Sequence, residues 1–87
     1  MALLGQIPEE VDSLAADLDS RAGDIETLIS AIASKLGATT WTGPDRDRFV
    51  GDWNSTLTSN LRNVAGSLRD AASVARQNAE QQRQASA

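Results

Sequence analysis

The sequence predicts an all-α protein: an antiparallel hairpin of two long helices that dimerises into a four-helix bundle. Two apolar stripes, each with steps of three and four residues, cover most of the 87 residues, and this period is helical. The segment Trp41-Thr42-Gly43-Pro44 separates the stripes and has the composition of a turn. A dimer is expected because 87 residues form one small domain, 1–87, and a lone hairpin leaves Leu28 and Phe49 beside the stripes in water.

The first helix is predicted over residues 8–36. Pro8 suits the first helical turn, and Glu9 and Glu10 lie favourably near the positive end of the helix dipole. Gly37 is a natural stop, so residues 37–43 are predicted to form the turn. The stripe of this helix consists of Val11, Leu14, Leu18, Ala22, Ile25, Ile29, Ile32 and Leu36.

The second helix is predicted over residues 44–79, again with proline first and with Asp45 and Asp47 in the opening turn. No apolar stripe continues beyond Ala79, so residues 80–87 are predicted to be a mobile tail. Its stripe consists of Val50, Trp53, Leu57, Leu61, Val64, Leu68, Ala71 and Ala75.

The large side chains near these stripes are the predicted core of either the hairpin or the dimer. They are Leu14, Leu18, Ile25, Ile29, Ile32, Leu36, Phe49, Trp53, Leu57, Leu61, Val64 and Leu68. Gly23 and Gly66 fall nearly opposite each other when the chain folds at the turn. They mark either a close approach of the two backbones or simple tolerance of glycine within a helix.

Charged residues also recur every seven positions and predict how the helices pair. Folding at Gly43 places Arg62 beside Asp24 and Glu26, and the next two arginines beside the acids one and two heptads earlier. The predicted pairing residues are Glu10, Asp17, Asp24, Arg62, Arg69 and Arg76, with Asp12 and Asp19 as neighbours. The alternative is that these are solvated faces with coincidental spacing. The same charges could also pair between chains.

Composition excludes several classes of function. The chain has no Cys, His or Tyr, and its acids lie on helices without a pocket to raise a pKa, so no enzyme, catalytic residue, metal site or cofactor is expected. The net charge of −4 argues against nucleic-acid binding, because the acidic helix neutralises the arginines. No apolar run is long enough for stable membrane insertion, and the start of the chain lacks the basic region of a secretory signal peptide.

The residues around the turn resemble a known family. Trp41-x-Gly43, followed by Phe49 and Trp53 between two amphipathic helices, is similar to the WXG family of ESAT-like proteins, which are small type VII secretion substrates of Gram-positive bacteria. The resemblance covers essentially the whole chain. It implies that Trp41 and Gly43 are the motif residues that serve export recognition. Without the resemblance, Trp41 is a hydrophobic plug that closes the hairpin end.

The resemblance also implies partners and location. Such proteins are made in the cytoplasm and exported without a leader peptide, as folded dimers, by an ATPase-driven membrane machine. The partner would be a second copy or a related WXG protein. The family often carries Tyr-x-x-x-Asp/Glu after the second helix, and this chain has no Tyr. A partner chain could carry that signal, a degenerate tail could suffice, or the chain could be a non-exported partner or chaperone of a larger substrate. A purely structural coiled-coil scaffold is the remaining alternative.

Overall fold

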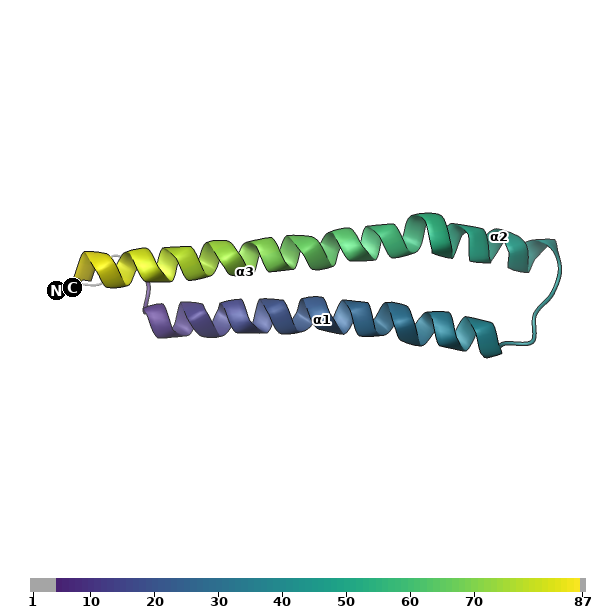
Figure 1. The fold of residues 1–87 in the computed structure, drawn as a ribbon, viewed down its shortest axis with the longest axis horizontal. Coiled ribbons are helices and arrows are strands. Elements are labelled where there is room, and N and C mark those ends of the chain that lie inside the picture. The colour runs from purple at the N-terminus through teal and green to yellow at the C-terminus, as the bar shows by residue number, and fades with distance from the viewer. Residues whose placement is uncertain (1–4, 87) are drawn as a thin grey trace.

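The computed structural model describes residues 5–86, and within them the protein is a long helical hairpin without strands (Figure 1). Helix α1 spans Pro8–Ala38. The returning arm consists of α2 (Pro44–Asp52), a π-helical segment (Trp53–Leu57) and α3 (Thr58–Ser86), which follow one another without a break. The start of α1 and the end of α3 lie at the same end of the hairpin, opposite the turn (Figure 1). The predicted all-α antiparallel hairpin is therefore confirmed, whereas dimerisation remains a prediction.

Both helical arms are longer than the sequence predicted. Helix α1 continues through Gly37 to Ala38, because Gly37 takes no positive φ and Thr39 ends the helix in extended conformation. The predicted mobile tail at 80–87 is wrong for residues 80–86, which are helical; Ala87 lies outside the described residues. This segment contains three Gln together with Glu80, Arg83 and Ala85, all of which favour helix, and Glu80 pairs with Arg83 one turn later.

Mostly small residues, rather than the predicted large ones, lie where the two helices meet. Their spacing is seven residues on both helices, as in a coiled coil. The fully buried members are all alanines, so α1 and α3 can approach closely. We call this set the alanine seam: Ala15, Ala22 and Ile29 on α1, and Thr58, Ala65, Ala72 and Ala79 on α3.

Gly23 and Gly66 do not mark a close backbone approach. A Cβ atom built on either glycine meets nothing within 4 Å, which favours the alternative of simple tolerance. Replacing either residue with alanine should therefore raise the free energy of unfolding by about 1 kcal/mol, because alanine restricts the unfolded chain and favours helix. Thermal unfolding of Gly23→Ala and Gly66→Ala checks this expectation. A lower melting temperature for either variant would show that its glycine is structurally required.

Candidate functional site: the turn and the apolar face

The turn after α1 is held by backbone and side-chain hydrogen bonds at both of its ends. The Thr39 hydroxyl donates to the carbonyl oxygen of Lys35 at 2.6 Å, and the Thr39 amide donates to the carbonyl oxygen of Leu36. At the other end, the carbonyl oxygen of Gly43 accepts a hydrogen bond from the amide of Asp47. Residues 39–43 thus form a short connection whose two ends are both fixed.

Gly43 has a backbone conformation that explains why glycine occupies this position. Its φ is 114° and its ψ is −179°, a region that is populated essentially by glycine alone. Nothing lies within 4 Å of a Cβ built at this residue, so the constraint comes from the backbone and not from crowding. The conformation lets Pro44 begin α2 directly after the turn.

Trp41 and Phe49 meet at the turn and form one wall of an apolar groove. Their ring centroids are 5.6 Å apart, and the rings are tilted by 50°. Trp41 is 37% exposed and Phe49 is 41% exposed, so the predicted core position of Phe49 is not a core position of the hairpin. We call this hollow, of about 220 Å³, the turn groove; its lining residues are Ile32, Lys35, Leu36, Thr39, Trp41 and Phe49.

Trp53 is the large aromatic side chain that the hairpin buries, with 7% exposure. It opens the π-helical segment, in which the Thr58 amide donates to the carbonyl oxygen of Trp53, five residues earlier. In a regular helix with a seven-residue repeat, the seam positions before Ala65 would be Thr58 and Gly51. The side chain of Trp53 would then point away from the seam. The wider π turn rotates the preceding segment and brings Trp53 inward. The sequence predicted one regular helix from residue 44 onward, so the π-helical segment is a difference from that prediction.

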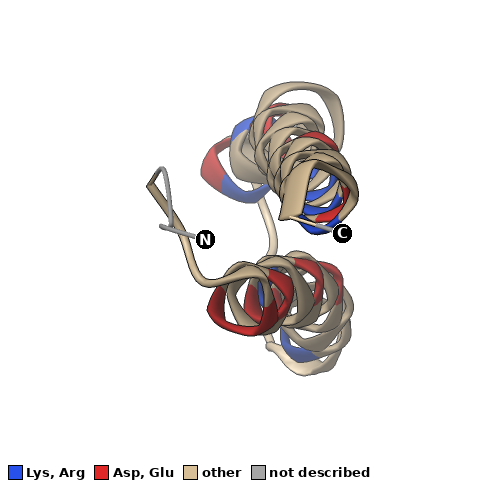
Figure 2. Cartoon of the chain, turned by 90° about the vertical axis from the view of Figure 1, so that its left-hand side faces the viewer, with Lys and Arg blue, Asp and Glu red and all other residues tan. Residues whose placement is uncertain are grey.

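Ion pairs run along one side of the alanine seam, but not with the predicted partners. Arg69 binds Glu26 at 3.4 Å and Arg76 binds Asp19 at 2.7 Å. Figure 2, viewed along the hairpin, shows acidic residues along α1 and basic residues on the arm that contains α3. Each of these α1 acids thus pairs with an arginine one heptad further along α3 than predicted. The reason is that a helical side chain points toward the N-terminus of its own helix, so a long arginine reaches past the residue opposite its Cα.

Several predicted pairing residues therefore have other roles. Asp17 and Asp24 bind Arg21 of their own helix. Within the part of the chain that the structure describes, Glu10 and Arg62 form no ion pair. We call the ion pairs between α1 and α3 the ladder. Each of these pairs is largely exposed and is worth about 0–1 kcal/mol, so the ladder contributes to the register of the two helices more than to their stability.

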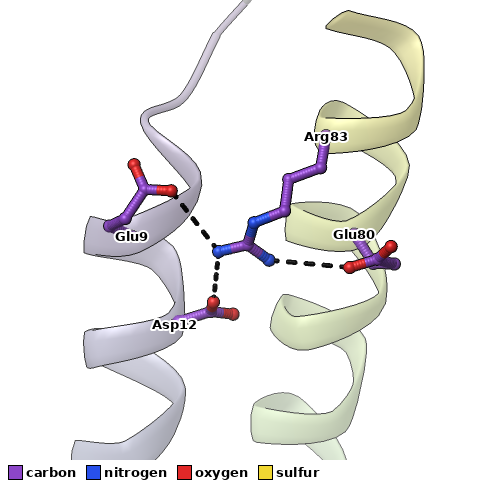
Figure 3. A network of polar contacts seen from close by, with 4 residues as sticks. All are labelled: Glu9, Asp12, Glu80 and Arg83. Carbon is purple, nitrogen blue, oxygen red and sulfur yellow. Dashed lines mark hydrogen bonds and ion pairs between the residues drawn. The ribbon is translucent and has the colours of Figure 1, made fainter. Parts of the chain in front are cut away.

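Arg83 closes the open end of the hairpin. Its guanidinium lies between Asp12 at 2.5 Å, Glu9 at 3.5 Å and Glu80 at 3.7 Å (Figure 3). The pKa of Arg83 is raised above its usual value, chiefly because Arg83 donates a hydrogen bond to Asp12. Because the pKa of this base is raised, deprotonation of Arg83 breaks the contact only at a pH above the usual range for arginine. This cluster holds the last turns of α3 against the start of α1.

The side of the seam opposite the ion pairs is apolar on both helices. On each helix the ladder residues come four positions after a seam residue, for example Asp19 after Ala15 and Arg69 after Ala65. Residues three positions after a seam residue therefore share the other side of the hairpin. The large apolar residues that directly precede a seam residue, and Val11, four positions before Ala15, lie on the same side. We call this set the apolar face: Val11, Leu14, Leu18, Ile25, Leu28, Ile32, Leu57, Leu61, Val64 and Leu68.

Most of the predicted core residues lie on this face and are not buried within the hairpin. Of that set, Ile29 and Trp53 are buried, whereas Leu14 is 55% exposed and Val64 is 50% exposed. Leu18, Ile25, Leu36, Leu61 and Leu68 are half-buried, and Ile32 and Leu57 are exposed. The hairpin therefore uses alanine for its own contact and leaves its larger aliphatic side chains partly in water.

The described residues contain no cluster of His, Cys, Asp and Glu that could hold a metal ion. No helix among residues 5–86 is both long enough and apolar enough to cross a membrane. The notable features are thus the turn groove with Trp41 and Gly43, and the apolar face. No protein-family model, curated protein or solved structure matches this chain.

Proposed function

We propose that this protein is a small, non-enzymatic helical hairpin that acts by protein–protein interaction and forms half of a four-helix bundle. The bundle would be exported from a Gram-positive bacterium by a type VII secretion machine, in which an ATPase drives transport. The observation that carries the proposal is the exposed Trp41 beside Phe49, at a turn whose Gly43 has a conformation restricted to glycine.

The apolar face supports the need for a second hairpin. Monomeric proteins rarely leave a contiguous apolar surface that follows two helices over their whole length. Packing two such faces together forms the core of a four-helix bundle with ordinary helix crossing angles. The turn groove lies at the end of this bundle, where a recognition element would stay accessible.

Replacing Trp41 with alanine tests the proposed role of the turn. The partly exposed ring contributes little to the hairpin, so Trp41→Ala should keep its helicity. We expect its export from a type VII-competent host to fall at least tenfold relative to wild type, measured by immunoblotting of culture medium and cell lysate. Val74→Ala is the matched control, because Val74 is 54% exposed on α3 and away from the turn.

A non-exported structural scaffold is the alternative, and the same experiment separates the two. If wild-type protein stays in the cells of several competent hosts, or Trp41→Ala is exported like wild type, the export role is wrong. The scaffold function would then remain, because it depends on the apolar face and not on Trp41.

A further inference from the structure

We propose that the π-helical segment is a register switch that opens and closes the turn groove. In the open register, which the structure shows, Trp53 is buried and Phe49 lies on Trp41. In the closed register the segment is a regular α-helix, Gly51 replaces Trp53 at the contact with α1, and the groove is lost. This inference concerns the hairpin itself and does not depend on the proposed export.

Irregular hydrogen bonds mark both ends of the segment in the open register. The Trp53 amide donates to the carbonyl oxygens of both Phe49 and Val50, so one donor is shared where α2 ends. The Thr58 amide reaches back five residues, to the carbonyl oxygen of Trp53. A single π turn within an α-helix is rare and is frequently found at functional sites. The burial of Trp53 is what this turn gains in exchange for regular helix geometry.

The sequence also encodes the closed register. Small residues recur every seven positions along the whole returning arm, at Gly51, Thr58, Ala65, Ala72 and Ala79. On α1 the seam position that follows Ile29 is Leu36, which is half-buried and lines the turn groove. A regular helix would therefore extend the alanine seam by one further layer, with Leu36 packed on Gly51.

Helix geometry determines where Phe49 points in each register. Successive residues of an α-helix are turned by about 100°, so Phe49, four residues before Trp53, lies within about 40° of Trp53. When Trp53 is buried, Phe49 therefore stays beside the groove, whereas Gly51 points away from α1 and is exposed. When Gly51 faces α1, the same helix turns Phe49 to the opposite side, away from Trp41.

The two arms of the hairpin are farther apart where Trp53 is buried. Among residues 5–86, no Cα atom of α2 or of the π-helical segment lies within 8 Å of a Cα atom of α1. Figure 1 shows the arms separating toward the turn. A tryptophan needs more room than the alanines of the seam, so Trp53 holds this end open. The turn groove, of about 220 Å³, lies in the opening.

The connection between α1 and α2 is long enough for the change of register. A rotation of α2 about its own axis moves the Cα atom of Pro44 by at most about 5 Å, the width of the Cα cylinder. The five residues 39–43 span up to about 17 Å when extended. The rotation can therefore take place without unwinding α1.

Burial of Trp53 makes the closed register the minor state. We expect its population to be about 0.1–10%, the usual range for a minor conformation. A molecule that packs against Trp41 and Phe49 finds this wall only in the open register. Its binding would therefore shift the hairpin further toward that register.

Two cysteines placed at the closed contact trap the minor state, since the natural chain has no cysteine. In the open register the Cα atoms of residues 36 and 51 are more than 8 Å apart, whereas a disulfide needs roughly 4.4–6.8 Å. Leu36→Cys combined with Gly51→Cys should form an intramolecular disulfide at least tenfold faster than Leu36→Cys combined with Asp52→Cys. Asp52 is the matched control, because it is turned away from α1 in both registers. Non-reducing electrophoresis separates this product from crosslinked dimers.

Deleting Ser55 from the first cysteine pair tests the role of the π turn. The deletion leaves Trp53 four residues before Thr58, so a regular α-helix buries Trp53 without a π turn. Gly51 is then turned about 120° away from the seam. Crosslinking should fall to the rate of the Asp52 control, and circular dichroism should show unchanged helicity.

Two outcomes would overturn this inference. If the cysteine pair at residues 36 and 51 crosslinks no faster than the Asp52 control, the closed register is not visited. Local unfolding of the turn end would give this result, because it exposes both pairs equally. If the deletion of Ser55 leaves crosslinking unchanged, the π-helical segment is not the switch. Both measurements use purified protein, so the secretion assay of Trp41→Ala decides the proposed export separately.

Discussion

Trp53→Ala should lower the free energy of unfolding by about 3–5 kcal/mol, the usual cost of truncating a buried aromatic side chain. Trp53 is the largest buried side chain among the described residues, and the hairpin otherwise buries mainly alanines. Because small domains have only about 5–15 kcal/mol of stability, this variant should lose much of its helicity at 37 °C. Urea unfolding followed by circular dichroism measures the change.

A substitution on the exposed surface supplies the comparison for Trp53. Val74→Ala removes an apolar side chain that is 54% exposed, and it should cost less than about 1 kcal/mol. Similar losses for the two variants would contradict the assignment of Trp53 as the anchor of the turn end.

Ala22→Leu should lower the free energy of unfolding by about 1–3 kcal/mol or more, since overpacking forces neighbouring elements apart. Ala22 is completely buried in the alanine seam, and a leucine there would separate α1 from α3. In a domain of this size each kcal/mol shifts the melting temperature by about 4–8 °C, so calorimetry detects the effect easily.

Ala16→Leu is the matched control for the seam. Ala16 is exposed on the same helix, one position after a seam residue, and leucine there should change stability by less than about 0.5 kcal/mol. If Ala22→Leu melts like Ala16→Leu, the two helices do not depend on close approach at the alanine seam.

Periodicity predicted the hairpin well because it depends only on where apolar residues recur. The positions of Pro8, Gly43 and Pro44 placed the two helix starts correctly. The hairpin core was harder to predict, because a hydrophobic stripe marks every face that avoids water. It does not say which part of that face contacts the other helix and which part stays exposed on the hairpin. Alanine carries a weak signal in such a pattern, yet its small side chain permits the close contact seen at Ala15 and Ala72.

The remaining differences arise from geometry that residue spacing does not contain. Arginine length and direction shifted the ion pairs by one heptad from their predicted partners. The sequence does contain a signal for the π segment, because neither Val50 nor Trp53 lies a multiple of seven residues before Ala65. That signal can be recognised only once Ala65 is known to lie in the seam. The chain beyond Ala79 stays helical through Arg83 and its acidic neighbours, a contact between ends that are far apart in sequence.

The elongated hairpin also determines how the protein moves in solution. Its Cα extents are 67 × 18 × 13 Å, and its radius of gyration is 19.5 Å, against about 12 Å for a compact chain of this length. A rod of this kind has more friction than a sphere of equal mass. It should therefore elute early from a sizing column even as a single chain, with an apparent mass well above 9.2 kDa. Pairing two rods side by side adds mass while adding little length, so elution volume and mass will not rise in proportion.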